Sequence, residues 1–205
     1  KDITISQKLD LSGAVLWSPE IPLSYILKQQ LFKEDSLIDK KQKSVALFDL
    51  RSDTESIKLN GSEFILKGTT YHPTNNEFGR LLSYTQMEND ITLIKEAGFN
   101  CVRFAAATIH PYYLQLCQVH GLFAFIELPI SEVPSGIAED QSLISRGKDF
   151  LFNYISFYGD YPSLAAIGLG ESYLPDMEAH ISLISSLAAS VKEKSNLLTY
   201  ASFFG

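Results

Sequence analysis

After residue 60, two patterns of apolar residues alternate along the chain. One is a short continuous run, typical of a buried strand, and the other repeats every three or four residues, typical of a helix. Met87, Ile91, Ile94 and Ala97 recur at three- and four-residue steps, which predicts one face of a helix over 86–98 that ends at Gly98. The same reasoning predicts helices over 111–120, 142–158 and 177–194. Apolar runs predict strands over 64–67, 100–104, 122–127, 162–170 and 197–201, the first of them turning at Gly68.

The two long helices near the end of the chain each carry an apolar stripe that we expect to be buried. In the helix over 142–158 the stripe comprises Phe150, Leu151, Tyr154, Ile155 and Tyr158. In the helix over 177–194 it comprises Ile181, Ile184, Leu187, Ala188 and Val191. Between the third strand and the first of these helices, residues 129–140 are expected to form an irregular loop.

The first 50 residues lack this alternation. Strands are predicted over 3–9, 24–32 and 44–48, with the charged residues 33–43 as a loop between the last two. This is antiparallel β material, but a sandwich needs about seven strands, so this domain is expected to be only the end of one. The predicted boundary falls near 51–55, which gives a β domain over 1–52 and an α/β domain over 53–205.

Strands alternating with helices through short connections predict a parallel sheet with right-handed crossovers. Five such strands and four helices make a little over half of a (β/α)8 barrel of about 250 residues. The alternative, a five-stranded doubly wound sheet, is disfavoured because residues 68–72 contain no glycine-rich phosphate loop. A part-barrel exposes strand edges and an apolar inner face, so we expect a longer parent protein or self-association of the isolated chain.

Composition excludes several classes of function. Hydrophobic residues make up 45% of the 205 positions, enough for a sizeable core. The net charge is −7 with no dense basic cluster beyond 40–43, which argues against nucleic-acid binding. No apolar run approaches the roughly 18 residues of a membrane span. Cys101 and Cys117 are predicted to be buried thiols, and they leave the compartment open.

Polar side chains stand where the predicted strands end. Tyr71 and His72 follow the first strand, Arg103 lies near the end of the second, and Glu127 ends the third. Because the ends of parallel strands meet on one face, this pattern indicates an active-site face. Glu127 lies between two apolar residues and must therefore be paired or perturbed. The structural alternatives are a turn hydrogen bond for His72 and an ion pair of Arg103 with Glu127 or Glu171.

No cofactor is predicted. The dinucleotide fingerprint is missing, and His72, Glu127 and Glu171 come from separate strands without metal-ligand spacing. His120 and His180 lie on predicted helices, where surface or packing roles are favoured.

Several short motifs resemble the family 2 glycoside hydrolases, the family of β-galactosidases, β-glucuronidases and β-mannosidases. These motifs occur in the family's order over essentially the whole chain, at residues 16–20, 59–61, 67–73, 79–80, 100–103, 110–112, 116–117, 161–163 and 199–202. The resemblance implies that residues 1–50 end an immunoglobulin-like sandwich. It also implies that the last strands of the barrel lie beyond Gly205.

The resemblance further implies a carbohydrate partner and hydrolysis of β-glycosides with retention, by two carboxylates. The family's nucleophile follows a strand later than the fifth, so this chain alone is predicted to be inactive. The family's acid/base glutamate stands in a Gly-Asn-Glu pattern at the fourth strand, where this chain has Gly170, Glu171 and Ser172. A gap-free alignment, which we favour, puts Ser172 at the catalytic position, whereas deletion of one residue puts Glu171 there.

Other positions also depart from the family's pattern. Thr70 replaces an asparagine, Ala106 a histidine and Ile126 an aspartate. All these departures fall on the catalytic face, which suggests loss of chemistry rather than loss of fold. The predicted function is therefore that of a fragment of a β-glycosidase. The alternatives are a catalytically inactive scaffold that binds carbohydrate or protein, and a purely structural module.

Overall fold

The computed structural model describes residues 6–73, 82–105 and 108–204. Its central sheet consists of five parallel strands in the spatial order β10-β9-β8-β7-β6. These are β6 (Gly68–Tyr71), β7 (Cys101–Phe104), β8 (Phe123–Glu127), β9 (Leu164–Gly168) and β10 (Leu198–Tyr200). Each strand pairs with the next one along the chain, as in a (β/α)8 barrel. In a doubly wound sheet, by contrast, the spatial order of the strands reverses at a switch point. The expected part-barrel is confirmed.

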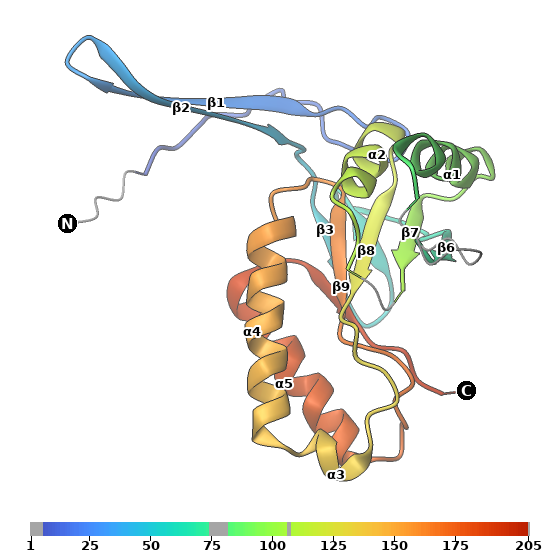
Figure 1. Ribbon diagram of the computed structural model, residues 1–205. Helices are drawn as coiled ribbons and strands as arrows, with labels where there is room; N and C mark the ends of the chain where they lie inside the picture. Colours follow the sequence, from blue (N-terminus) through green and yellow to red (C-terminus); the bar gives the residue numbers. More distant parts are fainter. Residues whose placement is uncertain (1–5, 74–81, 106–107, 205) are drawn as a thin grey trace.

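Helices connect the strands, as predicted (Figure 1). They are α1 (Tyr84–Glu96), α2 (Tyr112–His120), α4 (Gln141–Tyr158) and α5 (Glu178–Lys194). Gly121 ends α2 in the left-handed region, at φ 68°, which glycine adopts without strain. The region 129–140 is not wholly irregular, because it contains a short helix, α3 (Ser135–Ala138). α4 and α5 lie side by side, with α3 at one end of the pair.

The main hydrophobic core lies between the sheet and these helices. Val102, Phe104 and Ile126 from the strands are fully buried, as are Leu151 and Leu187 from the helices. The predicted stripes were partly wrong. Ile181 is 41% exposed and Phe150 38%, whereas Leu183, which the prediction omitted, is fully buried. The packing of α4 against α5 rotates the buried face, and helical spacing alone does not report that rotation.

A second core closes the amino-terminal ends of the strands. Trp17 is fully buried, with its ring 4.7 Å from that of Phe123, the first residue of β8. Phe48 and Phe64 also lie against Phe123. The small antiparallel sheet of β3 (Leu50–Ser52), β4 (Ile57–Leu59) and β5 (Ser62–Glu63) contributes Leu50 and Leu59 to the same core. Residues far apart in the sequence therefore meet below the barrel.

A long hairpin, β1 (Tyr25–Lys33) and β2 (Ser36–Val45), projects from the body of the molecule (Figure 1). The loop predicted over 33–43 is wrong, because most of it belongs to β2. Both faces of this hairpin are largely exposed, so its sequence shows no apolar alternation. Of the strand predicted over 3–9, residues 3–5 lie outside the described residues, and 6–9 form no strand. Only the first two residues of the strand predicted over 44–48 belong to β2.

The first barrel strand starts later than predicted. Residues 64–67 form no strand. Gly68, which was predicted to form a turn, is the first residue of β6. Gly68 pairs with Cys101, and a Cβ at position 68 would lie 2.5 Å from the Cys101 sulfur. The glycine therefore permits close approach of two strands rather than a change of direction.

Three expectations about the whole chain stay predictions. These are the division into 1–52 and 53–205, the immunoglobulin-like character of the first part, and self-association through the sheet edges at β6 and β10. Among the helices that the structure describes, none is both long enough and apolar enough to cross a membrane.

Candidate active site

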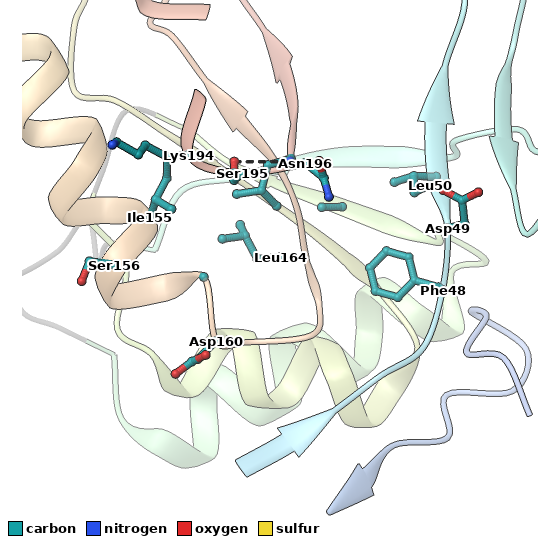
Figure 2. Close-up of a pocket in the computed structure, with 13 residues that line it drawn as sticks. Phe48, Asp49, Leu50, Ile155, Ser156, Asp160, Leu164, Lys194, Ser195 and Asn196 are labelled. Carbon is teal, nitrogen blue, oxygen red and sulfur yellow. Dashed lines mark hydrogen bonds between the residues drawn. The ribbon is translucent and has the colours of Figure 1, made fainter. Parts of the chain in front are cut away.

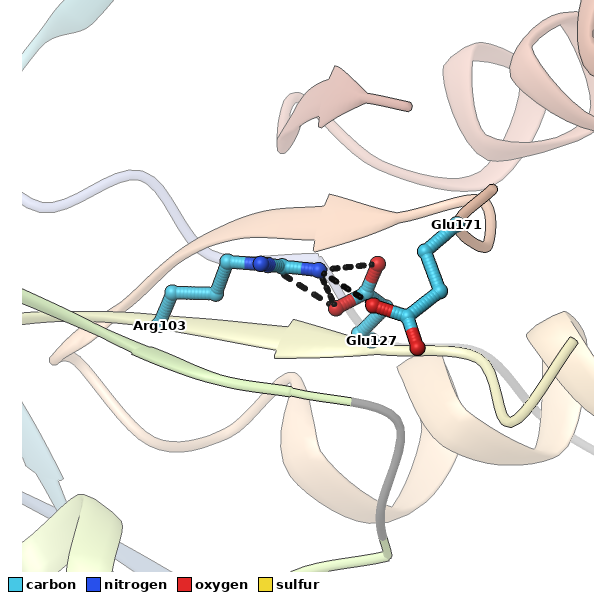
Figure 3. Close-up of polar contacts among 3 residues, drawn as sticks. All are labelled: Arg103, Glu127 and Glu171. Atoms are coloured by element: carbon cyan, nitrogen blue, oxygen red, sulfur yellow. Dashed lines mark hydrogen bonds and ion pairs between the residues drawn. The ribbon is translucent and has the colours of Figure 1, made fainter. Parts of the chain in front are cut away.

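Arg103 and Glu127 form a partly buried ion pair on neighbouring strands, β7 and β8 (Figure 3). The Arg103 Nε lies 2.9 Å from Glu127 Oε2, and Nη2 lies 3.0 Å from Oε1. The Glu127 side chain is fully buried. A buried carboxylate requires such pairing, and the two-pronged geometry fits a guanidinium to it. The expectation that Glu127 is paired is confirmed.

Glu171 joins this pair from the end of β9. Its Oε2 lies 3.0 Å from the same Arg103 Nη2. Unlike Glu127, the Glu171 side chain is 30% exposed, so it can meet a ligand. Burial lowers the pKa of Arg103, whereas Glu127 and Tyr200 raise it, and the net shift is upward. One cation thus faces two carboxylates (Figure 3), and the three groups carry a formal charge of −1.

Tyr200 and Gly168 belong to this cluster, although sequence reasoning assigned no site role to either. The Tyr200 ring centroid lies 5.9 Å from the Arg103 guanidinium carbon, and its hydroxyl is buried. Burial and the Glu127 carboxylate raise the pKa of Tyr200 above its usual range. A Cβ at Gly168 would lie 2.6 Å from Tyr200 Cζ and 2.7 Å from Glu127 Cγ. A glycine inside an apolar strand run was the available signal for this close approach.

The backbone on either side of Glu171 adopts unusual conformations. Gly170 has φ 117° and Ser172 has φ 63°, which is uncommon for a residue with a side chain. Hydrogen bonds hold this segment to both neighbours, because Glu171 N donates to Ile130 O and Ser202 N donates to Gly170 O. The segment therefore extends the strand order beyond the regular sheet. Glu171, rather than Ser172, contacts Arg103.

Tyr71 and His72 are not seen in contact with this cluster. The Tyr71 hydroxyl donates to Asp90 on α1 and lies 3.3 Å from the Tyr113 hydroxyl on α2. Burial, and then the hydrogen bond to Asp90, raise the pKa of Tyr71. These contacts put Tyr71 in the layer between sheet and helices. His72 is exposed just after β6. Substrate binding by either residue stays a prediction.

Two of the positions that depart from the family pattern are described, and one is not. Thr70 is exposed on β6. Ile126 is fully buried in the core beneath the helices, so the expectation that it lies on the catalytic face is wrong. Ala106 lies outside the described residues. Across residues 6–73, 82–105 and 108–204, no three His, Cys, Asp or Glu side chains are grouped to hold a metal ion.

A cavity of about 550 Å³ lies at the opposite end of the strands (Figure 2). Its lining includes Phe48 and Leu50 from the amino-terminal segment. It also includes Leu164, the first residue of β9, and Leu197, which directly precedes β10. Barrel enzymes place their chemistry at the carboxyl ends of the strands. The cluster of Arg103, Glu127 and Glu171 is therefore the candidate active site, and the cavity is not.

The sequence matches known proteins of one family. Residues 50–146 match the sequence model of "Glycosyl hydrolases family 2, TIM barrel domain". A putative β-glucuronidase of Formosa agariphila is 31% identical over 173 residues, which are 82% of this chain and 20% of that protein. A β-galactosidase of Psychromonas ingrahamii is 31% identical over 159 residues, which are 75% of this chain and 15% of that protein. The chain thus spans a fifth or less of these curated relatives.

Solved structures share the fold. A β-galacturonidase from Eisenbergiella tayi, bound to galacturonate, superposes with a TM-score of 0.85 at 23% identity. The match covers 97% of this chain and 36% of that one. A β-glucuronidase of Bacteroides uniformis superposes with a TM-score of 0.78 at 24% identity, over 92% of this chain and 24% of that one. Identities this low establish the fold and nothing further.

Proposed function

This chain belongs to family 2 of the glycoside hydrolases, and we propose that the full-length protein hydrolyses the O-glycosidic bonds of β-glycosides. The observation that carries the proposal is the position of Glu171. Its carboxylate is partly exposed at the carboxyl end of β9 and is oriented by Arg103, which is itself held by the buried Glu127. The names of the relatives, β-glucuronidase and β-galactosidase, support a carbohydrate substrate.

In the proposed mechanism Glu171 is the acid/base. Retaining hydrolysis needs a second carboxylate about 5–5.5 Å away as the nucleophile, and the family resemblance assigns it to a strand after β10. Glu171 gives a proton to the leaving oxygen and then removes one from the attacking water. Arg103 orients Glu171 through one contact while it pairs with Glu127 through two of its nitrogens. We propose that residues 1–205 alone hydrolyse no glycoside.

The gap-free alignment leads to a second candidate function. With Ser172 at the catalytic position, no acid is present there, and the protein would bind carbohydrate or a partner without hydrolysis. The exposed Thr70 favours this candidate, because it stands where the family pattern has an asparagine. The partial exposure of the Glu171 carboxylate at the carboxyl end of β9 favours hydrolysis instead.

Hydrolysis of aryl β-glycosides by the full-length protein tests the proposal. Aryl leaving groups need little acid assistance, so a panel that differs in the sugar is a forgiving first test. We expect turnover of at least one sugar. Silence across the panel, with the protein folded, would contradict hydrolysis and support the binding scaffold.

Glu171→Gln then assigns the acid. We expect roughly a hundred-fold loss or more for poor leaving groups and a smaller loss for activated aryl glycosides, because the lost proton matters most when the leaving group is basic. Glu139→Gln, at an exposed position near the end of α3, is the matched control. An unchanged rate in Glu171→Gln would support the gap-free alignment.

A further inference from the structure

His180, which the sequence placed on a helix without a site role, is buried in the first turn of α5. Only 2% of its surface is exposed. Its Nδ1 accepts a hydrogen bond of 2.9 Å from Leu174 N, and its Nε2 lies 2.7 Å from Val133 O. Because Nδ1 must accept while Nε2 must donate, only the neutral imidazole with its proton on Nε2 satisfies both partners.

These two partners belong to different loops. Val133 lies in the loop that follows β8, and Leu174 lies in the loop between β9 and α5. The same loops also meet nearer the strands, where Glu171 N donates to Ile130 O at 2.9 Å. The loops after β8 and β9 thus meet in a junction with two ends. Close to the strands the backbone of Glu171 joins them, and farther from the strands His180 joins them.

Tyr173 links the two ends of this junction. It is fully buried, its ring lies edge-on to His180 at 5.4 Å, and its hydroxyl donates to Leu169 O at 2.7 Å. Tyr173 N also donates to Ser202 O beyond β10. The Tyr173 ring therefore lies between His180 and the turn that contains Glu171.

The turn needs such support. Ser172, directly after Glu171, has φ 63°, and a residue with a side chain keeps such a conformation only when its surroundings over-determine it. Among residues 6–73, 82–105 and 108–204, the Glu171 side chain forms an ion pair with Arg103 Nη2 alone. Small shifts of the turn would therefore move the carboxylate away from Arg103.

We propose that His180 is a positioning residue, which joins the loops after β8 and β9 and so sets the place of the Glu171 carboxylate. This inference rests on the proposed function, in which Glu171 is the acid/base. His180 itself touches no substrate and transfers no proton.

The kinetic test compares variants of the full-length protein. His180→Phe keeps a ring but removes both hydrogen bonds, and we expect kcat to fall about 10- to 100-fold with KM changed less than about three-fold. His180→Gln can still donate toward Val133 O, so we expect partial rescue. The matched control is Leu183→Ala, a fully buried neighbour on α5 that contacts the core. We expect it to lower Tm while kcat, measured well below Tm, stays within about two-fold.

Equal losses of kcat in His180→Phe and Leu183→Ala would overturn the inference, because a general loss of stability would then explain both. An unchanged kcat in His180→Phe would overturn it as well.

A second readout does not depend on turnover. Hydrogen–deuterium exchange, followed on the peptide that covers residues 169–175, reports the amides of Glu171 and Leu174. We expect exchange there to quicken at least ten-fold in His180→Phe and to stay unchanged in Leu183→Ala. Unchanged exchange in His180→Phe would overturn the positioning role. Silence of the wild type on every glycoside, with faster exchange in His180→Phe, would overturn the proposed hydrolysis while the loop junction stands.

Discussion

β8 begins and ends in contrasting surroundings. At its start, Phe123 packs against Trp17, Phe48 and Phe64, an apolar cluster that closes the amino-terminal end of the strands. At its end, Glu127 is just as deeply buried but pairs with Arg103. The two residues are four positions apart on one strand, so the difference reflects what each end of the barrel is used for.

The comparison teaches which end stabilises the fold. Burying an aromatic ring removes a large apolar area from water and is favourable. Burying two opposite charges costs desolvation that their attraction barely offsets, so a buried pair is weak evidence for stability. A partly exposed Glu171 beside this pair is better explained by a ligand than by folding. Of the two ends of β8, the amino-terminal end therefore contributes more to stability, and chemistry is expected at the other.

The largest effect on stability is expected at the aromatic end. Phe123→Ala removes the ring that the other three contact, and we expect unfolding to become easier by about 3–5 kcal/mol. The measurement is the urea midpoint, with Phe157→Ala as the control. Phe157 is 62% exposed, so its loss should change stability by no more than about 0.5 kcal/mol. Similar losses of stability in Phe123→Ala and Phe157→Ala would contradict the view that the aromatic cluster at the start of β8 stabilises the fold.

The second prediction separates a buried ion pair from an exposed one. Arg103→Met leaves Glu127 charged, buried and without its guanidinium, and we expect a cost of about 3 kcal/mol. The double variant Arg103→Met with Glu127→Gln should recover part of that cost, because the buried charge is gone. Lys43→Met, which breaks the exposed pair of Lys43 with Asp160, is the control and should cost less than about 1 kcal/mol. A double variant no more stable than Arg103→Met would contradict the account.

The smallest effect concerns an exposed charge on the carboxyl-end side. Asp140 caps α4 by accepting from Ser142 N, and this hydrogen bond holds the pKa of Asp140 below its ordinary value. A lowered folded pKa gives stability that is present above the unfolded pKa of about 4 and lost as pH falls through the folded pKa. Asp140→Asn keeps an acceptor but does not titrate. The Tm of the wild type minus that of Asp140→Asn should therefore decline from pH 6 to pH 2.5, and a constant difference would refute it.

Much of the candidate site could be predicted from residue type and place alone. Arg103 and Glu127 stand at the ends of strong apolar runs, and a charge in such company must be paired. The pairing with Glu171 was one of the stated alternatives. Tyr200 and His180 were not predicted as site residues. An aromatic residue on a short strand and a histidine on a helix are common in any core, so neither one indicates a site by its type or spacing. Their contacts join segments more than twenty residues apart.

The sequence by itself determined the strand and helix alternation, the helix ends at Gly98 and Gly121, and the charged strand ends. These are local properties, set by spacing and by backbone preference within one element. Only the tertiary structure decided that residues 36–45 pair with β1, that β6 begins at Gly68, and that Arg103 is shared by two carboxylates. Each of these depends on partners distant in sequence, whose approach is governed by packing between elements rather than by any pattern within one.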